Sequence, residues 1–205
     1  MPSALLMREM VEPKRITCTV EGGVTLVSAL GDETLLQQEK LGLFCSRQCP
    51  GELILKSYDL MQAIRDAGVT VISGFHAPMD KECLRILLRG KQPVIYCPAR
   101  SIEDMRLKPE FREPVKQGRM LVLSPFPAEK RRITASLAEE RNRFVAALAD
   151  AILYIHAAPG SKTGQLCREA ISQGKRVFAI ASQYNANIVA LGARPVSTGA
   201  TDWFA

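Results

Sequence analysis

The segment from Glu140 to Ile180 decides the fold of this chain. It reads ERNRFVAALAD (140–150), AILYI (151–155), HAAPGSKT (156–163), GQLCREAISQG (164–174) and KRVFAI (175–180). The runs AILYI and VFAI are wholly apolar, which is typical of strands that are covered on both faces of a parallel sheet. Helical patterns precede and follow the first run. This order of helix, strand, loop, helix and strand predicts a parallel α/β unit.

The same rhythm of short apolar runs extends through most of the chain. The runs lie at 41–45, 70–73, 93–97, 120–124, 151–155 and 176–180. Helical patterns at 50–67, 78–89 and 165–173 lie between them, and each ends at a glycine. Proline in a first turn and glycine after a last turn are the expected helix boundaries. The sequence therefore predicts a Rossmann-like, doubly wound α/β fold with a mainly parallel sheet of about six strands.

The chain of 205 residues suits one hydrophobic core. We expect residues 1–39 to form an N-terminal extension that flanks the main sheet, because this part lacks the rhythm described above. Residues 40–205 are expected to form a single Rossmann-like domain that binds a nucleotide or a phosphate.

The composition indicates a soluble protein with an affinity for polyanions. The 27 Lys and Arg residues exceed the 21 Asp and Glu residues, and this balance favours anionic partners.

No apolar run approaches the roughly 18 residues of a membrane span, and the first residues do not resemble a secretory signal. Most of the six cysteines lie in apolar runs, as in proteins of a reducing cytosol. Cys45 and Cys49 lack the neighbours of a zinc site. We expect a cytoplasmic protein without a metal or a cofactor.

Small, hydroxyl-bearing and basic residues follow the apolar runs at the carboxyl ends of the predicted strands. In an open parallel sheet, ligands bind at this edge, and the helix that follows each strand offers free N–H groups to a phosphate. The predicted pocket residues at this edge are Ser46, Arg47, Ser73, Gly74, His76, Arg100, Gly160, Ser161, Lys162 and Thr163.

The loop from Ala158 to Thr163 suggests a phosphate site but is not the loop of a nucleoside-triphosphatase. That motif requires glycine directly before its lysine, whereas Ser161 precedes Lys162 here. Two interpretations stay open for this loop. It binds a phosphate, or it is a strand-to-helix turn in which Thr163 is the N-cap.

Arg141 occupies the apolar face of its predicted helix. Ser136 and Glu139 form a capping box that would start the helix near Leu137. Arg141 is then one turn from Leu137 and Phe144, so it should point into the core. A buried guanidinium needs a carboxylate, carbonyl oxygens or a ligand anion. Arg141 is therefore either a structural tie or a ligand residue.

Five segments together resemble the DprA/Smf group of DNA-processing proteins, within the wider Rossmann-like set that includes the LOG phosphoribohydrolases. GLFCSR (42–47) is similar to its VGSR strand end, SGFHAPMD (73–80) to SGxAxGID, and ERNRFVAAL (140–148) to RNRIIAGLS. PGSKT (159–163) is similar to SGSLxTA, and GKRVFAI (174–180) to GRxVFAVPG.

The resemblance implies a Rossmann-like protein that binds single-stranded DNA, helps to load a recombinase on it, and is usually a homodimer. The ligand residues that it implies are Ser46, Arg47, Ser73, Gly74, Arg141, Asn142, Gly160, Ser161 and Lys162. The function that we expect is non-catalytic binding of a nucleotide or single-stranded nucleic acid in DNA processing or recombination.

Two alternatives belong to other classes of function. The first is a LOG-like nucleoside-monophosphate phosphoribohydrolase, whose PGGxGTxxE motif carries a glutamate. Here that position is Cys167, the nearest acid is Glu169, and glycosidic cleavage needs a carboxylate within reach. Glu82 is the other acid that could take this role. The second alternative is a nucleotide sensor that acts through a partner protein.

Overall fold

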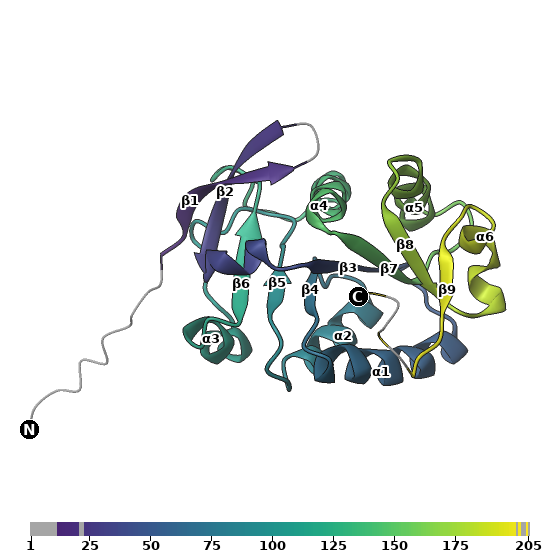
Figure 1. Ribbon diagram of the computed structural model, residues 1–205. Helices are drawn as coiled ribbons and strands as arrows, with labels where there is room; N and C mark the ends of the chain where they lie inside the picture. The colour runs from purple at the N-terminus through teal and green to yellow at the C-terminus, as the bar shows by residue number, and fades with distance from the viewer. Residues whose placement is uncertain (1–11, 21–22, 200, 202–203, 205) are drawn as a thin grey trace, which may run out of the picture.

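The computed structural model describes residues 12–20, 23–199, 201 and 204. One nine-stranded sheet runs through the molecule, with helices on both faces (Figure 1). The strands are β1 Lys14–Val20, β2 Gly23–Gly31, β3 Lys40–Cys45, β4 Thr70–Ser73, β5 Val94–Tyr96, β6 Met120–Ser124, β7 Ala151–His156, β8 Arg176–Ile180 and β9 Arg194–Val196. The α-helices are α1 Gly51–Asp66, α2 Pro78–Leu87, α3 Pro109–Lys116, α4 Ala135–Leu148, α5 Lys162–Ser172 and α6 Ala186–Val189.

The predicted α/β class and the mainly parallel sheet are confirmed. The six predicted strands correspond to β3 through β8, all mutually parallel along the order β6-β5-β4-β3-β7-β8. The predicted number of about six strands is wrong, because the described sheet has nine. The three strands beyond the six are β1, β2 and β9, whose one-sided or partial burial removes the continuous apolar run that marks a central strand.

The hairpin of β1 and β2 extends the sheet beyond β6. β2 pairs antiparallel with β6, and Ser28 lies opposite Ser124. The described part of the expected 1–39 extension thus continues the same sheet. Residues 1–11, 21 and 22 of that extension lie outside the described residues, as do residues 200, 202, 203 and 205 of the expected 40–205 domain.

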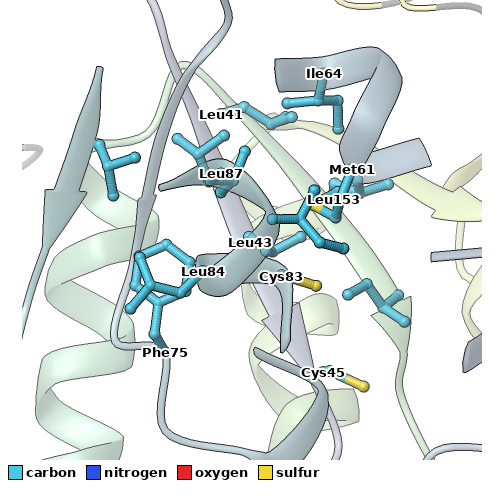
Figure 2. Close-up of a cluster of buried hydrophobic side chains, with 14 of the residues drawn as sticks. Leu41, Leu43, Cys45, Met61, Ile64, Phe75, Cys83, Leu84, Leu87 and Leu153 are labelled. Atoms are coloured by element: carbon cyan, nitrogen blue, oxygen red, sulfur yellow. The ribbon is translucent and has the colours of Figure 1, made fainter. Parts of the chain in front are cut away.

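Two hydrophobic layers hold the helices on the sheet. On one face α1, α2 and α3 pack on the strands, and Figure 2 shows Met61, Ile64 and Leu87 meeting Leu41 and Leu153. On the other face α4, α5 and α6 pack on the same strands (Figure 1). No helix in the described part of the chain is long and apolar enough to cross a membrane.

The direction of the chain reverses at β3. From β3 the chain proceeds through β4, β5 and β6 toward one edge, then returns to β7 on the other side of β3. Loops that follow two neighbouring strands leave a crevice where the strand order reverses in this way, and open α/β sheets bind ligands there. The fold therefore directs attention to the ends of β3 and β7.

The predicted start of α4 is wrong by two residues. Thr134 is the N-cap in place of the expected capping box at Ser136, and its Oγ1 accepts a hydrogen bond from the N–H of Leu137 at 3.2 Å. Thr134 has the extended backbone that an N-cap needs. The helical face is unaffected, so Arg141 still points inward.

Candidate anion-binding site

The loops that follow β3 and β7 meet at the point where the strand order reverses. The Ser46 Oγ accepts a hydrogen bond from the N–H of Ala158 at 2.9 Å and lies 3.4 Å from the Ser161 Oγ. The N–H of Ser46 donates to the carbonyl oxygen of His156 at 2.8 Å. Two predicted pocket residues that are 115 positions apart in the sequence are thus in contact.

The N-terminus of α5 opens at this junction. Gly160 has a φ of 70°, a left-handed conformation that suits glycine and lets the chain turn into the helix. Ser161 is the N-cap: its Oγ donates to the Ala158 carbonyl at 2.6 Å and accepts from the N–H of Gly164 at 3.0 Å. The expected N-cap role of Thr163 is therefore wrong, since Thr163 is already the second residue of the helix.

The first turn of α5 keeps free donors. The N–H groups of Lys162 and Thr163 make no hydrogen bond to any described residue, and the turn contains no acidic side chain. The exposed Lys162 ammonium lies 3.4 Å from the Glu139 carboxylate. Free N–H groups at the positive end of a helix dipole attract an anion, and a phosphate fits this arrangement well.

Arg141 is buried, with 3% of its surface exposed, as its place on the helical face predicts. Its Nη1 donates to the carbonyl oxygen of Cys97 at 2.7 Å, and its Nε donates to the Asn142 Oδ1 at 2.8 Å. Burial lowers the pKa of the guanidinium. Among the described residues, no carboxylate lies within 4.0 Å of it and its Nη2 has no hydrogen-bond partner. Arg141 is therefore a structural tie that still has a donor to offer.

The turn after β4 is built around this arginine. A Cβ at Gly74 would lie 1.4 Å from the Arg141 Nη1, so only glycine fits there. Phe75, which follows, has a φ of 43°, a strained conformation for a residue with a side chain. The Ser73 Oγ donates to the Leu43 carbonyl at 2.7 Å and accepts from the N–H of Phe75 at 3.3 Å. In this structure the Ser73 hydroxyl holds the turn.

Three cations act electrostatically on the exposed His76. Partial burial is the main cause that lowers the pKa of this imidazole, and the charges of Arg141, Lys81 and Arg47 lower it further. Those three side chains therefore lie close enough to share one electrostatic environment, and they make the edge near β3 and β4 positive. Lys81 was not predicted from the sequence, because a lysine in the first turn of a helix carries no distinctive signal.

Asp80 is a second residue that the sequence did not single out as a site residue. The residue is 7% exposed, its Oδ2 accepts a hydrogen bond from the N–H of Ala77 at 3.2 Å, and its buried Oδ1 has no hydrogen-bond partner. Burial raises the pKa of this carboxyl to about 7. An acid in the first turn of a helix is usually solvated, so nothing in the sequence indicates this burial.

Arg100 lies in a neighbouring hollow of about 130 Å³. Ser101, Asp104 and Arg131 also line the hollow, and the Arg131 Nη2 lies 2.9 Å from the Asp104 carboxylate. Burial raises the pKa of the Tyr96 hydroxyl, and the nearby charges of Arg141 and Arg100 partly offset this effect. The hollow thus extends the positive edge beyond β5.

Of the acids that phosphoribohydrolase chemistry would use, Glu169 lines a small pocket with Asn142 and Lys162, but Glu169 and Glu82 are both paired with arginines. Cys167 is buried in the core beneath α5. Glu169 pairs with Arg143 at 3.0 Å, and Glu82 pairs with Arg85 on the surface of α2. Neither glutamate joins the contact between Ser46 and Ser161.

These features define a Rossmann-like α/β protein with a candidate anion-binding edge at the reversal of strand order. Residues 8–202 match the family model of the DNA recombination-mediator protein A, and the chain belongs to that family. No curated protein matches the chain.

Solved structures share the fold. DNA processing protein A from Streptococcus pneumoniae is 21% identical with a TM-score of 0.70, and the match covers 85% of this chain and 64% of that protein. A Helicobacter pylori structure, described as showing a single-stranded DNA binding mode of DNA processing protein A, is 18% identical with a TM-score of 0.67 and coverages of 84% and 83%. A molybdenum cofactor binding protein from Rippkaea orientalis is 13% identical, with a TM-score of 0.53 and coverages of 78% and 91%.

Proposed function

We propose that this protein binds single-stranded DNA, or a nucleotide that resembles one of its units, through phosphates at the carboxyl edge of the sheet. The open first turn of α5, which touches Ser46 and offers the free N–H groups of Lys162 and Thr163, is the observation that carries this proposal. A phosphate bound there would share a positive edge with Arg47 and Arg141. Membership of the DNA recombination-mediator family supports a role in DNA processing.

The role that we propose is binding without catalysis. The arrangement supplies hydrogen-bond donors and cations, which are the groups that position phosphates in complexes with DNA. Single-stranded DNA offers a row of phosphates that could pass from α5 along the edge toward the hollow at Arg100. A partner recombinase and a homodimer are proposed on the family relationship alone, and the chain spans 64% of the Streptococcus pneumoniae protein.

The test is the affinity of the full chain for a fluorescent oligothymidylate, measured by anisotropy over a salt series. Each phosphate contact should contribute a slope of about −0.7 to the plot of log K against log salt concentration. Arg141→Met should weaken binding about 10- to 100-fold, as expected for a lost hydrogen bond to a charged group. Arg112→Met removes an exposed charge from α3 and should change affinity less than about twofold.

Two outcomes would contradict the proposal. One is an affinity that does not depend on salt. The other is an Arg141→Met variant that keeps the thermal stability of the parent and also keeps its affinity.

A phosphoribohydrolase is the second candidate, and Asp80 is the observation that favours it. A carboxyl with a pKa of about 7 is suited to proton transfer near neutral pH. Incubation with the four common nucleoside monophosphates, followed by chromatography for free base, distinguishes the two functions. If the parent chain releases free base and the Asp80→Asn variant does not, the protein is a hydrolase. If the parent chain releases no base, binding remains the proposed function.

A further inference from the structure

A buried histidine ends β7 beside the candidate anion-binding site. His156 is the last residue of that strand and is 6% exposed. Its carbonyl oxygen accepts the hydrogen bond from the N–H of Ser46, whose hydroxyl lies next to that of Ser161. Buried polar side chains are ordinarily paired within the protein. The partners of the two ring nitrogens therefore show what the imidazole can still offer to a ligand.

The Nδ1 of His156 is paired within the protein. It lies 3.1 Å from the Oδ1 of Asn185, which directly precedes α6. The Asn185 Nδ2 donates to the carbonyl oxygens of Ile155 and Ile180, each at 2.9 Å. These carbonyls, at the ends of β7 and β8, occupy both N–H groups of the amide. The opposite orientation of the amide would turn its oxygen toward two carbonyl oxygens, so the Oδ1 faces the imidazole and accepts from it.

This network sets the tautomer of the ring. Because the Asn185 Oδ1 carries no proton, the His156 Nδ1 must donate one. A neutral imidazole then has an unprotonated Nε2, which is a hydrogen-bond acceptor. In the described part of the chain the Nε2 has no hydrogen-bond partner, and it is not among the polar atoms that are both unpaired and fully enclosed. The ring thus keeps one acceptor that is open to solvent.

The free acceptor is close to the proposed phosphate site in the fold but differs from it in chemistry. Ser46 contacts the backbone of His156 on one side and Ser161, the N-cap of α5, on the other. The first turn of α5 offers N–H donors, whereas the Nε2 offers a lone pair. An ionised phosphate has only acceptor oxygens, so it cannot pair with the neutral imidazole. Internal nucleotides of DNA have no hydroxyl group, and only their bases can donate.

We infer that the neutral imidazole of His156 accepts a hydrogen bond from a base N–H of the bound nucleotide. Asn185 is then a positioning residue, because it holds the proton on the Nδ1 and leaves the Nε2 free. In thymine the donor must be N3–H, which is the only N–H group of that base. The contact rests on the proposed function, since the phosphate at α5 brings the base to this edge. The tautomer does not depend on that function.

The tautomer is measured by long-range ¹H–¹⁵N correlation of the histidine rings at about pH 9, where imidazoles are ordinarily neutral. The chain has two histidines, so the spectrum of a His156→Asn variant identifies the signals of His156. We expect a protonated Nδ1 and an unprotonated Nε2 in the parent chain. A proton on the Nε2 with an unprotonated Nδ1 would overturn the inference.

The contact with the base is measured by calorimetry with thymidine 5′-monophosphate and its N3-methyl derivative, which lacks the donor. The parent should bind the methylated compound about five- to tenfold more weakly, as expected for one lost hydrogen bond. His156→Asn keeps a donor for Asn185 but has no atom at the place of the Nε2. This variant should bind the two compounds within about twofold of each other. His156→Gln places an amide oxygen there and should retain part of the preference.

The outcomes separate a ligand contact from a purely structural histidine. A structural role predicts that His156→Asn, which keeps the bond to Asn185, also keeps the full preference of the parent, and that result would refute the contact. Equal binding of the two compounds by the parent would refute it as well, while the proposed function would stand. If the parent binds neither compound and no oligothymidylate, the proposed function fails and the contact fails with it.

Discussion

The helices α2 and α5 both begin at the carboxyl edge of the same sheet, yet their first turns are built differently. α2 has an acid in its first turn, and the Asp80 carboxyl accepts a hydrogen bond from the N–H of Ala77. α5 is capped by the neutral Ser161 and has no acid in its first turn. One helix start therefore has a carboxyl group of its own chain at its N-terminus, and the other does not.

This difference shows that a helix N-terminus at a sheet edge does not by itself make a binding site. The positive end of a helix dipole is available to a ligand only where the chain has not already placed a carboxylate there. The buried Asp80 and Arg141 influence each other electrostatically, which keeps the α2 side of the edge from being strongly negative. The comparison therefore supports α5 rather than α2 as the proposed phosphate site.

The largest effect that we predict concerns the stability of the α2 side. Burial raises the pKa of Asp80 from 3.8 to about 7, so between these pH values the folded chain holds a proton that the unfolded chain has lost. The contribution of Asp80 to stability should therefore fall as the pH rises from about 4 to about 7. The shift corresponds to at most about 4 kcal/mol.

Asp80→Asn removes this titration and should make the chain more stable than the parent at pH 8 but not at pH 4. Urea unfolding at several pH values measures the difference. Asp59→Asn, which changes an exposed acid on α1, is the matched control and should have little effect. Equal pH profiles for the parent and Asp80→Asn would show that the buried carboxyl does not titrate as proposed.

The second prediction makes α5 resemble α2. Ser161→Asp places a carboxylate over the free donors of α5, so affinity for oligothymidylate should fall about 100-fold, or about 3 kcal/mol. Stability should change by less than about 0.5 kcal/mol, because aspartate caps a helix as well as serine does. Ser161→Asn is the neutral control and should bind within about threefold of the parent. Anisotropy and thermal unfolding measure the two quantities, and equal affinities for the two variants would remove α5 from the site.

The third prediction concerns the glycine that accommodates Arg141. Gly74→Ala puts a methyl group where the guanidinium lies, so the folded chain should lose about 2 kcal/mol and bind DNA more weakly. In an Arg141→Ala background the same substitution should cost less than about 0.5 kcal/mol, because the clash is gone. A double-mutant cycle by urea unfolding measures this coupling, and additive costs would show that Arg141 does not occupy the space beside Gly74.

The central part of the fold was predictable because buried parallel strands produce continuous apolar runs. The six continuous apolar runs do not include β1, β2 and β9, because these strands are only partly buried. The predicted helix starts differ from the observed ones where several hydroxyl-bearing residues are close together in the sequence. Thr134 and Ser161 are the N-caps because the backbone is extended at those residues. Propensity does not distinguish such neighbours, since tertiary packing decides between them.

The sequence predicts the positions of those site residues that helical or strand periodicity determines. Arg141 had to point inward from its helical face, and the ends of β3 and β7 had to lie at the same edge once the sheet was parallel, whereas their adjacency comes from the strand order of the structure. Asp80 and Lys81 were not predicted as site residues, because charged residues are common in the first turn of a helix. Only the packing of the structure shows that Asp80 is buried. The separate hollow at Arg100 depends on the path of two loops, which no periodicity describes.

The most direct test of the difference between α5 and α2 is a titration of the ¹⁵N-labelled chain with thymidine 5′-monophosphate, followed by amide NMR. Our account predicts that the amide signals of Lys162 and Thr163 shift in a saturable manner, while those of Met79 and Asp80 in the first turn of α2 stay in place. Saturable shifts at α2 without shifts at α5 would contradict the account.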